Sequence, residues 1–227
     1  MLYQLQEGSK YFNKHENEGY KFYSFSNIFP AQDVKTGEER SCLIASPDQD
    51  FIEWLYGKFS VFQQEQKVIN IGEMQFTISR MSYIKQAIRQ GVRLITGTPV
   101  VMRIPKQKYK EYGIESERPY EYWRPEHDFN AFVSQLHGNL VKKYEQYYGK
   151  KTEIASPFEQ FKFKKSVCVH RIEQGREQKT IGSLWEFKFS NPEPEQRELL
   201  WLGLESGFGE LNSSGFGFMN VVKNGDN

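Results

Sequence analysis

The stretch "GFGELNSSGFG" (residues 207–217) places four glycines within eleven residues, and the interpretation of the rest of the chain starts from it. Two Gly-Phe-Gly triplets enclose a polar middle, and "FMNVV" follows at once in the pattern of a strand. Glycine takes up backbone conformations that are closed to other residues, and it lets a second group approach the backbone closely. The stretch therefore predicts a sharply turning loop with a close neighbour.

Two interpretations of this loop stay open from spacing alone. No Gly-Lys-Ser/Thr follows, so it is not a Walker loop, and it comes after a predicted helix, which excludes a dinucleotide-binding fingerprint. The glycines either cap that helix and turn the chain, or they expose backbone N–H groups to a sugar-phosphate backbone. Asn212, Ser213 and Ser214 add short hydrogen-bonding side chains at the tip.

The segments before the loop alternate between helical and strand periodicity. Residues 128–148 carry an apolar stripe at three- and four-residue steps and predict a long helix that Gly149 caps. Alternating apolar residues over 159–171 and 180–190 predict two strands, which the turn at 173–178 joins into a hairpin.

The remaining segments of the second half complete a recognisable order. Asn191-Pro192 predicts a helix start, with Asn as the cap and Pro in the first turn. A strand near 98–104 and a last strand at 216–222 then give the order β-α-β-β-α-β, which is that of a ferredoxin-like unit.

The first half has similar elements. Residues 51–66 predict an amphipathic helix, and 68–79 predict a half-buried strand. Turn signals over 89–99 predict a connection between two units, and the stretch 105–125, rich in proline and charge, predicts an exposed loop. The fold class that follows is α+β, with two tandem ferredoxin-like modules at residues 1–96 and 97–227.

Composition limits the functions that the chain can have. The 227 residues are 38% hydrophobic and 26% charged, and the net charge is only +1, so a nucleic acid would need a local basic face. The two cysteines, Cys42 and Cys168, have neither metal-site nor disulfide-framework spacing and predict buried, reduced thiols. We see no apolar run of about 18 residues and no leader pattern, so we expect a cytoplasmic protein without a membrane partner.

The glycine pattern also resembles a known family. Gly-hydrophobic-Gly, five residues, and Gly-hydrophobic-Gly close to the C-terminus is similar to the glycine-rich loop of the RAMP (repeat-associated mysterious protein) superfamily of RNA-binding proteins. More narrowly, the chain resembles the CRISPR-associated endoribonucleases that cut precursor repeat RNA into guide units. The segment "KFYSFSNIF" (21–29) and the hairpin at 159–190 extend the resemblance, which implies tandem ferredoxin-like (RRM-like) modules.

The resemblance implies a reaction that needs neither metal nor cofactor. The 2′-hydroxyl attacks the adjacent phosphate, the 5′-oxygen leaves, and a 2′,3′-cyclic phosphate forms. Such chemistry needs a base, an acid and a cation beside the phosphate, roles that suit histidine and lysine. By resemblance, the catalytic residues are His15, Lys21 and Tyr3, and Tyr20 or Tyr23 could substitute for Tyr3.

The resemblance also indicates which residues contact RNA. On the loop these are Gly207, Gly209, Asn212, Ser213, Gly215 and Gly217. On the strand "FKFKKSV", Lys162, Lys164 and Lys165 interleave with phenylalanines, which suits phosphates and bases, although alternation alone predicts a solvent-facing row. We expect Lys142 and Lys143 to be solvated, and His127 and His137 to be surface residues.

Three functions remain open at this point. The first is an endoribonuclease acting on single-stranded or weakly structured CRISPR repeat RNA. The second is a non-catalytic RAMP-type RNA-binding protein or interference-complex subunit, which the start at "MLYQLQEGSK" favours because we expect the first module to lack its opening strand. The third is an unrelated domain whose glycine loop holds a small anion. Homodimer formation and hand-over of the product to an interference complex also stay open.

Overall fold

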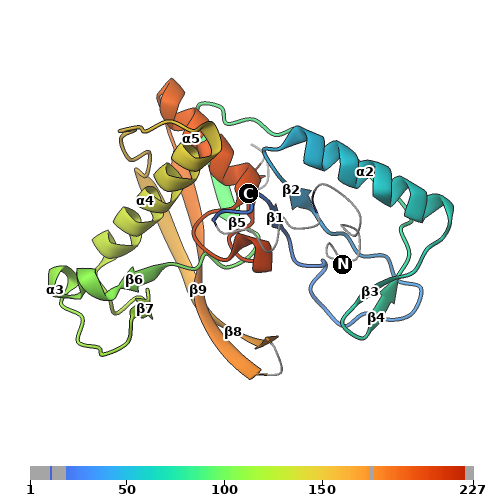
Figure 1. Cartoon of the computed structure of the whole chain (residues 1–227), viewed down its shortest axis with the longest axis horizontal. Coiled ribbons are helices and arrows are strands. Elements are labelled where there is room, and N and C mark those ends of the chain that lie inside the picture. Colours follow the sequence, from blue (N-terminus) through green and yellow to red (C-terminus); the bar gives the residue numbers. More distant parts are fainter. Residues whose placement is uncertain (1–10, 12–18, 174–175, 223–227) are drawn as a thin grey trace.

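The computed structural model describes residue 11 and residues 19–173 and 176–222. Figure 1 shows two parts side by side: helices α4 and α5 with a long hairpin on one side, and helix α2 with short strands on the other.

We call the part with α2 the first part and the C-terminal part with α4 and α5 the second part. The second part is built on one four-stranded antiparallel sheet. Its strands lie in the order β10-β5-β9-β8. The elements follow one another as β5 (Val92–Thr96), α4 (Phe129–Tyr148), β8 (Gln160–Glu173), β9 (Arg176–Phe189), α5 (Pro194–Ser206) and β10 (Met219–Val222). With the fourth strand beside the first and the third between the first and second, this is the ferredoxin-like order that the sequence predicts for this half.

The first strand of this unit is not the predicted one. β5 covers 92–96, within the stretch that we expected to connect two units, and residues 98–104 contribute mainly isolated bridges and the short strand β6 (Arg103–Pro105). β5 is short, but Val92 and Leu94 alternate into the core while the strand pairs with a neighbour on each edge. Burial between two strands therefore outweighs the turn-forming residues around it.

The prediction of an exposed loop at 105–125 is also wrong. It contains η2 (Lys106–Lys108), α3 (Tyr109–Tyr112) and β7 (Tyr120–Tyr122), which pairs with β6. Tyr109 and Trp123 are buried, and the Trp123 ring lies 4.9 Å from that of Phe132 and 5.5 Å from that of Trp185. These aromatic anchors hold a segment whose proline and charge content suggested an exposed loop.

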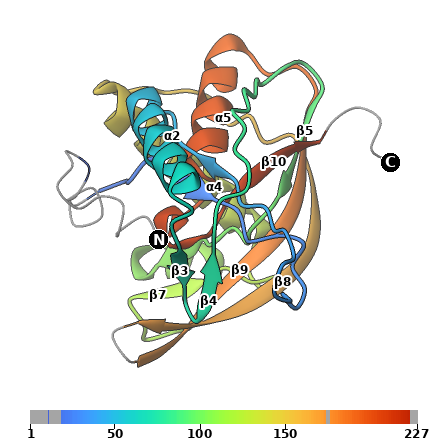
Figure 2. The same ribbon diagram turned by 90° about the vertical axis from the view of Figure 1, so that its right-hand side faces the viewer.

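The core lies between the sheet and the two long helices. Phe132, Leu136 and Leu140 of α4 are fully buried against a row of aromatic rings on β9. That row consists of Trp185, Phe187 and Phe189. The residues between them on β9 point to the other face, as the period of two requires. Figure 2 shows the hairpin of β8 and β9 bending and running beyond the ends of β5 and β10.

The start of α5 corrects the predicted cap. The helix begins at Pro194, and Glu193 caps it, in a capping box with Gln196. Asn191 is exposed and lies before the helix. A glutamate that reciprocates with the glutamine three residues later replaces the cap residue that Asn191-Pro192 suggested.

The first part has its own small core. The described elements are β1 (Ser24–Phe25), β2 (Ile44–Ala45), α2 (Gln49–Gln64), β3 (Ile69–Ile71) and β4 (Met74–Phe76). Tyr11, Tyr23, Phe51 and Leu55 form a separate buried cluster, which confirms the predicted apolar face of α2. The expected strand at 68–79 is instead the hairpin of β3 and β4, with Gly72 in the left-handed region at the turn.

The two parts touch through a few specific contacts. The Tyr147 hydroxyl donates to the carbonyl of Pro47 at 2.8 Å, and the Phe22 ring lies 5.2 Å from the Tyr147 ring. The boundary at residue 96 stays a prediction, although β5 precedes it and pairs within the sheet of the second part. The described residues of the first part do not by themselves complete a second four-stranded unit.

Two further expectations concern the surface. Both cysteines are free and exposed, so the prediction of buried thiols is wrong; Cys168 lies on β8 in the part of the hairpin beyond the pairing with β5. Across the described ranges, no helix has both the length and the apolar character that crossing a membrane demands.

Candidate functional site

A cleft of about 610 Å³ lies where the two parts meet. Four segments that are far apart in the sequence contribute to it. They are residues 19–23, the strand β6 with its neighbours, one face of α4, and Ser206 with residues 210–213 of the glycine loop. The folding of the chain therefore brings the glycine loop and the segment around Lys21 to one place.

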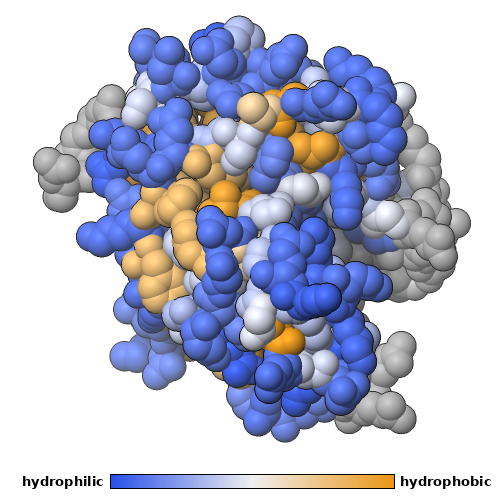
Figure 3. Space-filling model, turned by 90° about the vertical axis from the view of Figure 1, so that its left-hand side faces the viewer, coloured by the Kyte–Doolittle hydropathy of each residue, from blue (hydrophilic) through white to orange (hydrophobic). Residues whose placement is uncertain are grey.

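The cleft is basic. Lys21, Arg103, Lys108 and Lys142 contribute cations to its lining, and Glu210 is the acidic residue among the described lining residues. Figure 3, which faces the side of α3 and α4, shows mostly hydrophilic side chains around a limited hydrophobic band. A chain with a net charge of +1 thus concentrates positive charge locally, as binding to an anionic polymer requires.

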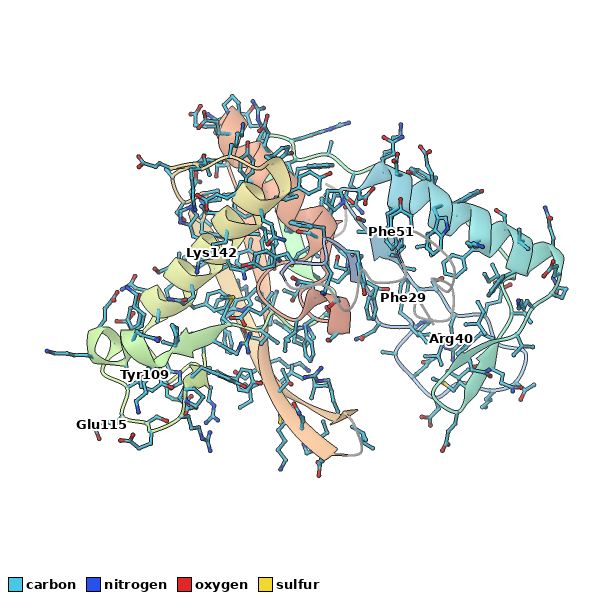
Figure 4. All side chains as sticks on the ribbon, viewed as in Figure 1. Phe29, Arg40, Phe51, Tyr109, Glu115 and Lys142 are labelled. Atoms are coloured by element: carbon cyan, nitrogen blue, oxygen red, sulfur yellow. The ribbon has the colours of Figure 1, made fainter. Side chains whose placement is uncertain are left out.

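Helix α4 supplies a polar face beside its apolar one. Gln135, Gly138, Asn139 and Lys142 are spaced by three, one and three residues, so they share one side of the helix and line the cleft. Figure 4 labels Lys142 on this helix. The apolar stripe that packs on the sheet therefore fixes which polar residues reach the cleft.

Lys143 lies beneath the glycine loop and is buried. Its Nζ donates to the carbonyls of Gly207 and Gly209 at 2.6 and 3.0 Å and to Oδ1 of Asn212 at 2.7 Å. Three acceptors match the three hydrogens of an ammonium group. The expectation that Lys143 is solvated is wrong, because this side chain ties α4 to the loop.

Burial lowers the pKa of Lys143 to about 7, and the Glu210 carboxylate acts in the opposite direction. The ammonium loses its hydration in this position, and the two carbonyls and the amide oxygen replace it only in part. The Tyr20 ring, 5.6 Å from Nζ, covers another side of the group.

Asn212 completes the internal network of the loop. Its Nδ2 donates to the carbonyls of Phe208 and Phe216, at 3.1 and 3.0 Å, while Oδ1 accepts from Lys143. Both ends of the amide are thus used inside the protein. This network supports a role for Asn212 in the shape of the loop. Asn212 also lines the cleft, and its contact with RNA stays a prediction.

The glycines answer the question of what approaches the loop. Gly207, Gly209, Gly215 and Gly217 all have positive φ angles, between 69° and 90°. A Cβ on Gly207 would meet the Asn212 side chain at 2.5 Å, and one on Gly209 would meet the Val101 carbonyl at 2.6 Å. The close neighbour is the chain itself, so these glycines are required by the packing of the loop before any ligand arrives.

Most of the loop's backbone donors are also occupied. The N–H groups of Phe208, Glu210 and Gly217 donate to the carbonyls of Gly217, Val101 and Pro99 at 2.8–2.9 Å. Gly207, Gly209 and Gly217 are buried, whereas Ser213 is partly exposed and lines the cleft. Gly215 is also partly exposed, and Asn212 lines the cleft beside Ser213. RNA contact by the loop residues stays a prediction.

The predicted catalytic residues fall into two groups. Lys21 is partly exposed and lines the cleft. His15 and Tyr3 lie outside the described residues. Of the two tyrosines considered as substitutes for Tyr3, Tyr20 lines the cleft and hydrogen-bonds Asn139 at 3.4 Å, and Tyr23 is fully buried against Phe51.

The hairpin lysines lie elsewhere. Lys162, Lys164 and Lys165 are exposed but are not part of the cleft lining. Lys164 and Arg93 both bond the Glu186 carboxylate, which lowers the pKa of Glu186 to about 2. RNA contact by the three lysines stays a prediction, and Lys164 would have to share its charge with this carboxylate.

The described histidines have local partners. A ring nitrogen of His137 lies 2.9 Å from the Ile154 carbonyl, and Nδ1 of His127 accepts from the backbone of Arg124. His170 pairs with Glu177 on the hairpin. In the part of the chain that the structure describes, no three His, Cys, Asp or Glu side chains gather as a metal site would need.

Two residues of the cleft, Arg103 and Asn139, were not among the predicted site residues, and Lys143 was predicted to be solvated. Arg103 fell in the strand that we expected near 98–104. Asn139 and Lys143 lie on the predicted helix, one step from its apolar stripe. Both lie beside the apolar stripe of this helix, so a segment that packs next to the core can cover them.

Comparisons with known proteins find a matching family model and similar sequences. A family model described as "CRISPR associated protein Cas6, C-terminal" matches residues 83–221, a span that includes β5 and the glycine loop. The CRISPR-associated endoribonuclease Cas6 of Haloferax mediterranei is 31% identical over 232 residues, which cover 98% of this chain and 84% of that protein.

Solved structures share the fold. One described as "CRISPR associated protein Cas6" matches with a TM-score of 0.66 at 22% identity, covering 98% of this chain and 88% of its own. Another, described as a RAMP protein binding different RNA substrates, matches with a TM-score of 0.65 at 21% identity, covering 89% of this chain and 80% of its own.

Proposed function

The chain belongs to the Cas6 family of CRISPR-associated proteins, and from that premise we propose that it is an endoribonuclease that binds CRISPR repeat RNA and cuts precursor transcripts into guide RNAs. The observation that carries the proposal is that Lys21 and the glycine loop line the same basic cleft. A polyanion fits this cleft, because cations from three separate segments line it.

The proposed reaction is metal-independent. The 2′-oxygen forms a bond to phosphorus, the bond from phosphorus to the 5′-oxygen breaks, and a 2′,3′-cyclic phosphate remains. A base takes the proton from the 2′-hydroxyl and an acid returns one to the 5′-oxygen, roles that we assign to His15 and to Tyr3 or Tyr20. Lys21 stabilises the extra charge on the phosphate.

The test is cleavage of a labelled repeat RNA in EDTA, beside a matched RNA with a single 2′-deoxy substitution at the cut. We expect the wild type to cut the first RNA only. His15→Ala and Lys21→Ala should each slow cleavage about 100-fold or more, and Lys35→Ala, on an exposed loop, should leave it unchanged. Cutting of the deoxy RNA, or dependence on added metal, would contradict the mechanism.

A second function remains a candidate for the same cleft. A non-catalytic RNA-binding relative would bind the repeat RNA with the same salt dependence and leave it intact. Binding without cleavage by the wild type would therefore establish this alternative. Homodimer formation, hand-over to an interference complex and a cytoplasmic location stay predictions.

A further inference from the structure

Arg103 is held in a defined position on the wall of the cleft. It lies on β6, its side chain is 38% exposed, and it lines the cleft together with Lys21 and Lys142. An exposed arginine on a surface normally samples many rotamers. Here two neighbours from different segments restrain the guanidinium.

The first neighbour is Glu210 of the glycine loop. One carboxylate oxygen accepts from the backbone N–H of Arg103 at 3.1 Å, and the other accepts from Nε of the same residue. The backbone N–H of Glu210 donates in turn to the Val101 carbonyl at 2.9 Å. Glu210 is therefore held at its backbone N–H and at both carboxylate oxygens, and its carboxylate bonds the guanidinium through Nε.

The second neighbour is Tyr120 on β7. The guanidinium carbon of Arg103 lies 4.9 Å from the centre of the Tyr120 ring, which is a cation–π contact. The Tyr122 ring meets the Tyr120 ring edge to face at 5.5 Å and supports it. An arginine fixed by a carboxylate on one edge and a ring on one face loses little freedom when it binds a further group.

The glycine loop itself carries no lysine or arginine between residues 207 and 217. The cations near it come from other segments, and the loop's carboxylate bonds Arg103 directly. Glu210 uses the Nε edge, and the Tyr120 side chain also hydrogen-bonds the guanidinium. The carboxylate therefore does not occupy the terminal nitrogens, which are the donors that pair with phosphate oxygens.

We propose that Arg103 binds a phosphate of the RNA backbone in the cleft and that Glu210 is its positioning residue. The ligand in this inference rests on the proposed function, but binding can be measured without cleavage. The glycine loop would thus act on RNA indirectly, by presenting a carboxylate that orients a cation on the neighbouring strand.

Charge and position predict opposite effects for Glu210. If only the charge of Glu210 mattered, Glu210→Gln would remove a negative group from the cleft and tighten binding of a polyanion. If Glu210 positions Arg103, the same substitution weakens binding. Glu210→Asp, which keeps the charge, would then recover part of the affinity.

The experiment is fluorescence anisotropy with repeat RNA that carries 2′-deoxy at the cut, at several salt concentrations. We expect Arg103→Gln to weaken binding about 10-fold and to lower the slope of log affinity against log salt by about 0.7, the value for one phosphate contact on a single strand. Glu210→Gln should weaken binding about 3-fold, with little added effect in Arg103→Gln.

Arg93→Gln is the matched control, because Arg93 also pairs with a glutamate, Glu186, at similar exposure but outside the cleft. The affinity of Arg93→Gln for the repeat RNA should equal that of the wild type.

Unchanged affinity and salt slope in Arg103→Gln, while the wild type still binds, would overturn this inference alone. Absence of wild-type binding would overturn it together with the proposed function, and tighter binding by Glu210→Gln would reject the positioning role. If Glu210→Gln fails to fold, Arg103→Gln still decides whether the phosphate contact exists.

Discussion

At the scale of single residues, glycine and lysine decide the shape of the C-terminal loop. Each glycine sits where a side chain would strain the backbone, and in three of the four positions it would also strike a neighbouring group. Lys143 then fills the space beneath with a donor for two carbonyls and an amide. The loop is consequently a packed structure with one edge on the cleft.

Gly217→Ala should be strongly destabilising. Its φ is +69°, and a Cβ there would overlap the Phe208 carbonyl, which is backbone and cannot move aside cheaply. We expect a loss of about 3 kcal/mol or more in the free energy of unfolding, measured by urea denaturation. Gly57→Ala is the control: it lies within α2 with open space around it, so a gain of about 0.5–1 kcal/mol should follow. Equal effects would contradict this account.

Lys143→Met should destabilise the protein by about 2–4 kcal/mol, because three buried acceptors lose their donor. The pKa of Lys143 is about 7 when folded and near 10.5 in an unfolded chain. Between these values the unfolded state holds more protons, so this residue makes wild-type stability rise as pH increases from 7 towards 10.

Urea denaturation at pH 7 and at pH 9.5 tests whether Lys143 makes wild-type stability rise with pH. The free-energy gap between wild type and Lys143→Met should widen at the higher pH. Lys142→Met, one residue away and exposed, should shift neither stability nor its pH dependence. A gap that stays constant with pH would show that Lys143 titrates as an ordinary lysine.

At the scale of elements, periodicity located the long helices and the hairpin. The stripe of α4 and the alternation of β8 and β9 were visible in the sequence because each element buries one continuous face. β5 was missed because five residues are too few to show a period, and its burial depends on β9 and β10 arriving from far along the chain. The N-cap of α5 was also misplaced, because several residues before this helix have side chains that can cap it.

Glu193→Ala tests the cap of α5. Glu193 and Gln196 bond each other's backbone, so removing the side chain should lower stability by about 1 kcal/mol, seen as a lower thermal midpoint. Asn191→Ala, at the position that sequence reasoning favoured, should change the midpoint little because Asn191 is exposed and precedes the helix. A lower thermal midpoint in Asn191→Ala, with no change in Glu193→Ala, would show that Asn191 caps the helix.

At the scale of the whole molecule, the near-neutral charge hides a polarised surface. The cleft gathers cations from β6, α4 and the segment around Lys21, and the hairpin carries its own lysines on a different surface. Because the cleft and the hairpin surface both carry lysines, charge alone does not decide which of the two binds RNA. The packing of the first part against the glycine loop and α4 forms the cleft and sets the path available to a strand of RNA.

Lys142→Gln and Lys162→Gln compare the two surfaces. If RNA lies in the cleft, the first variant should bind repeat RNA several-fold more weakly with a smaller salt slope, and the second should match the wild type. Binding measured at two salt concentrations is sufficient. A loss confined to Lys162→Gln would instead support our prediction that the hairpin lysines contact RNA.

The sequence by itself determined the ferredoxin-like order of the second half, the amphipathic helices, the hairpin and the glycine-rich loop, because each depends on local periodicity or on a contiguous motif. Only the tertiary structure decided that β5 is the first strand, that Lys143 of α4 bonds Asn212 of the loop, and that Glu210 bonds Arg103. These features join residues about 70 to 110 positions apart. No local pattern encodes such pairs, because their energy comes from burial that exists only once the chain has folded.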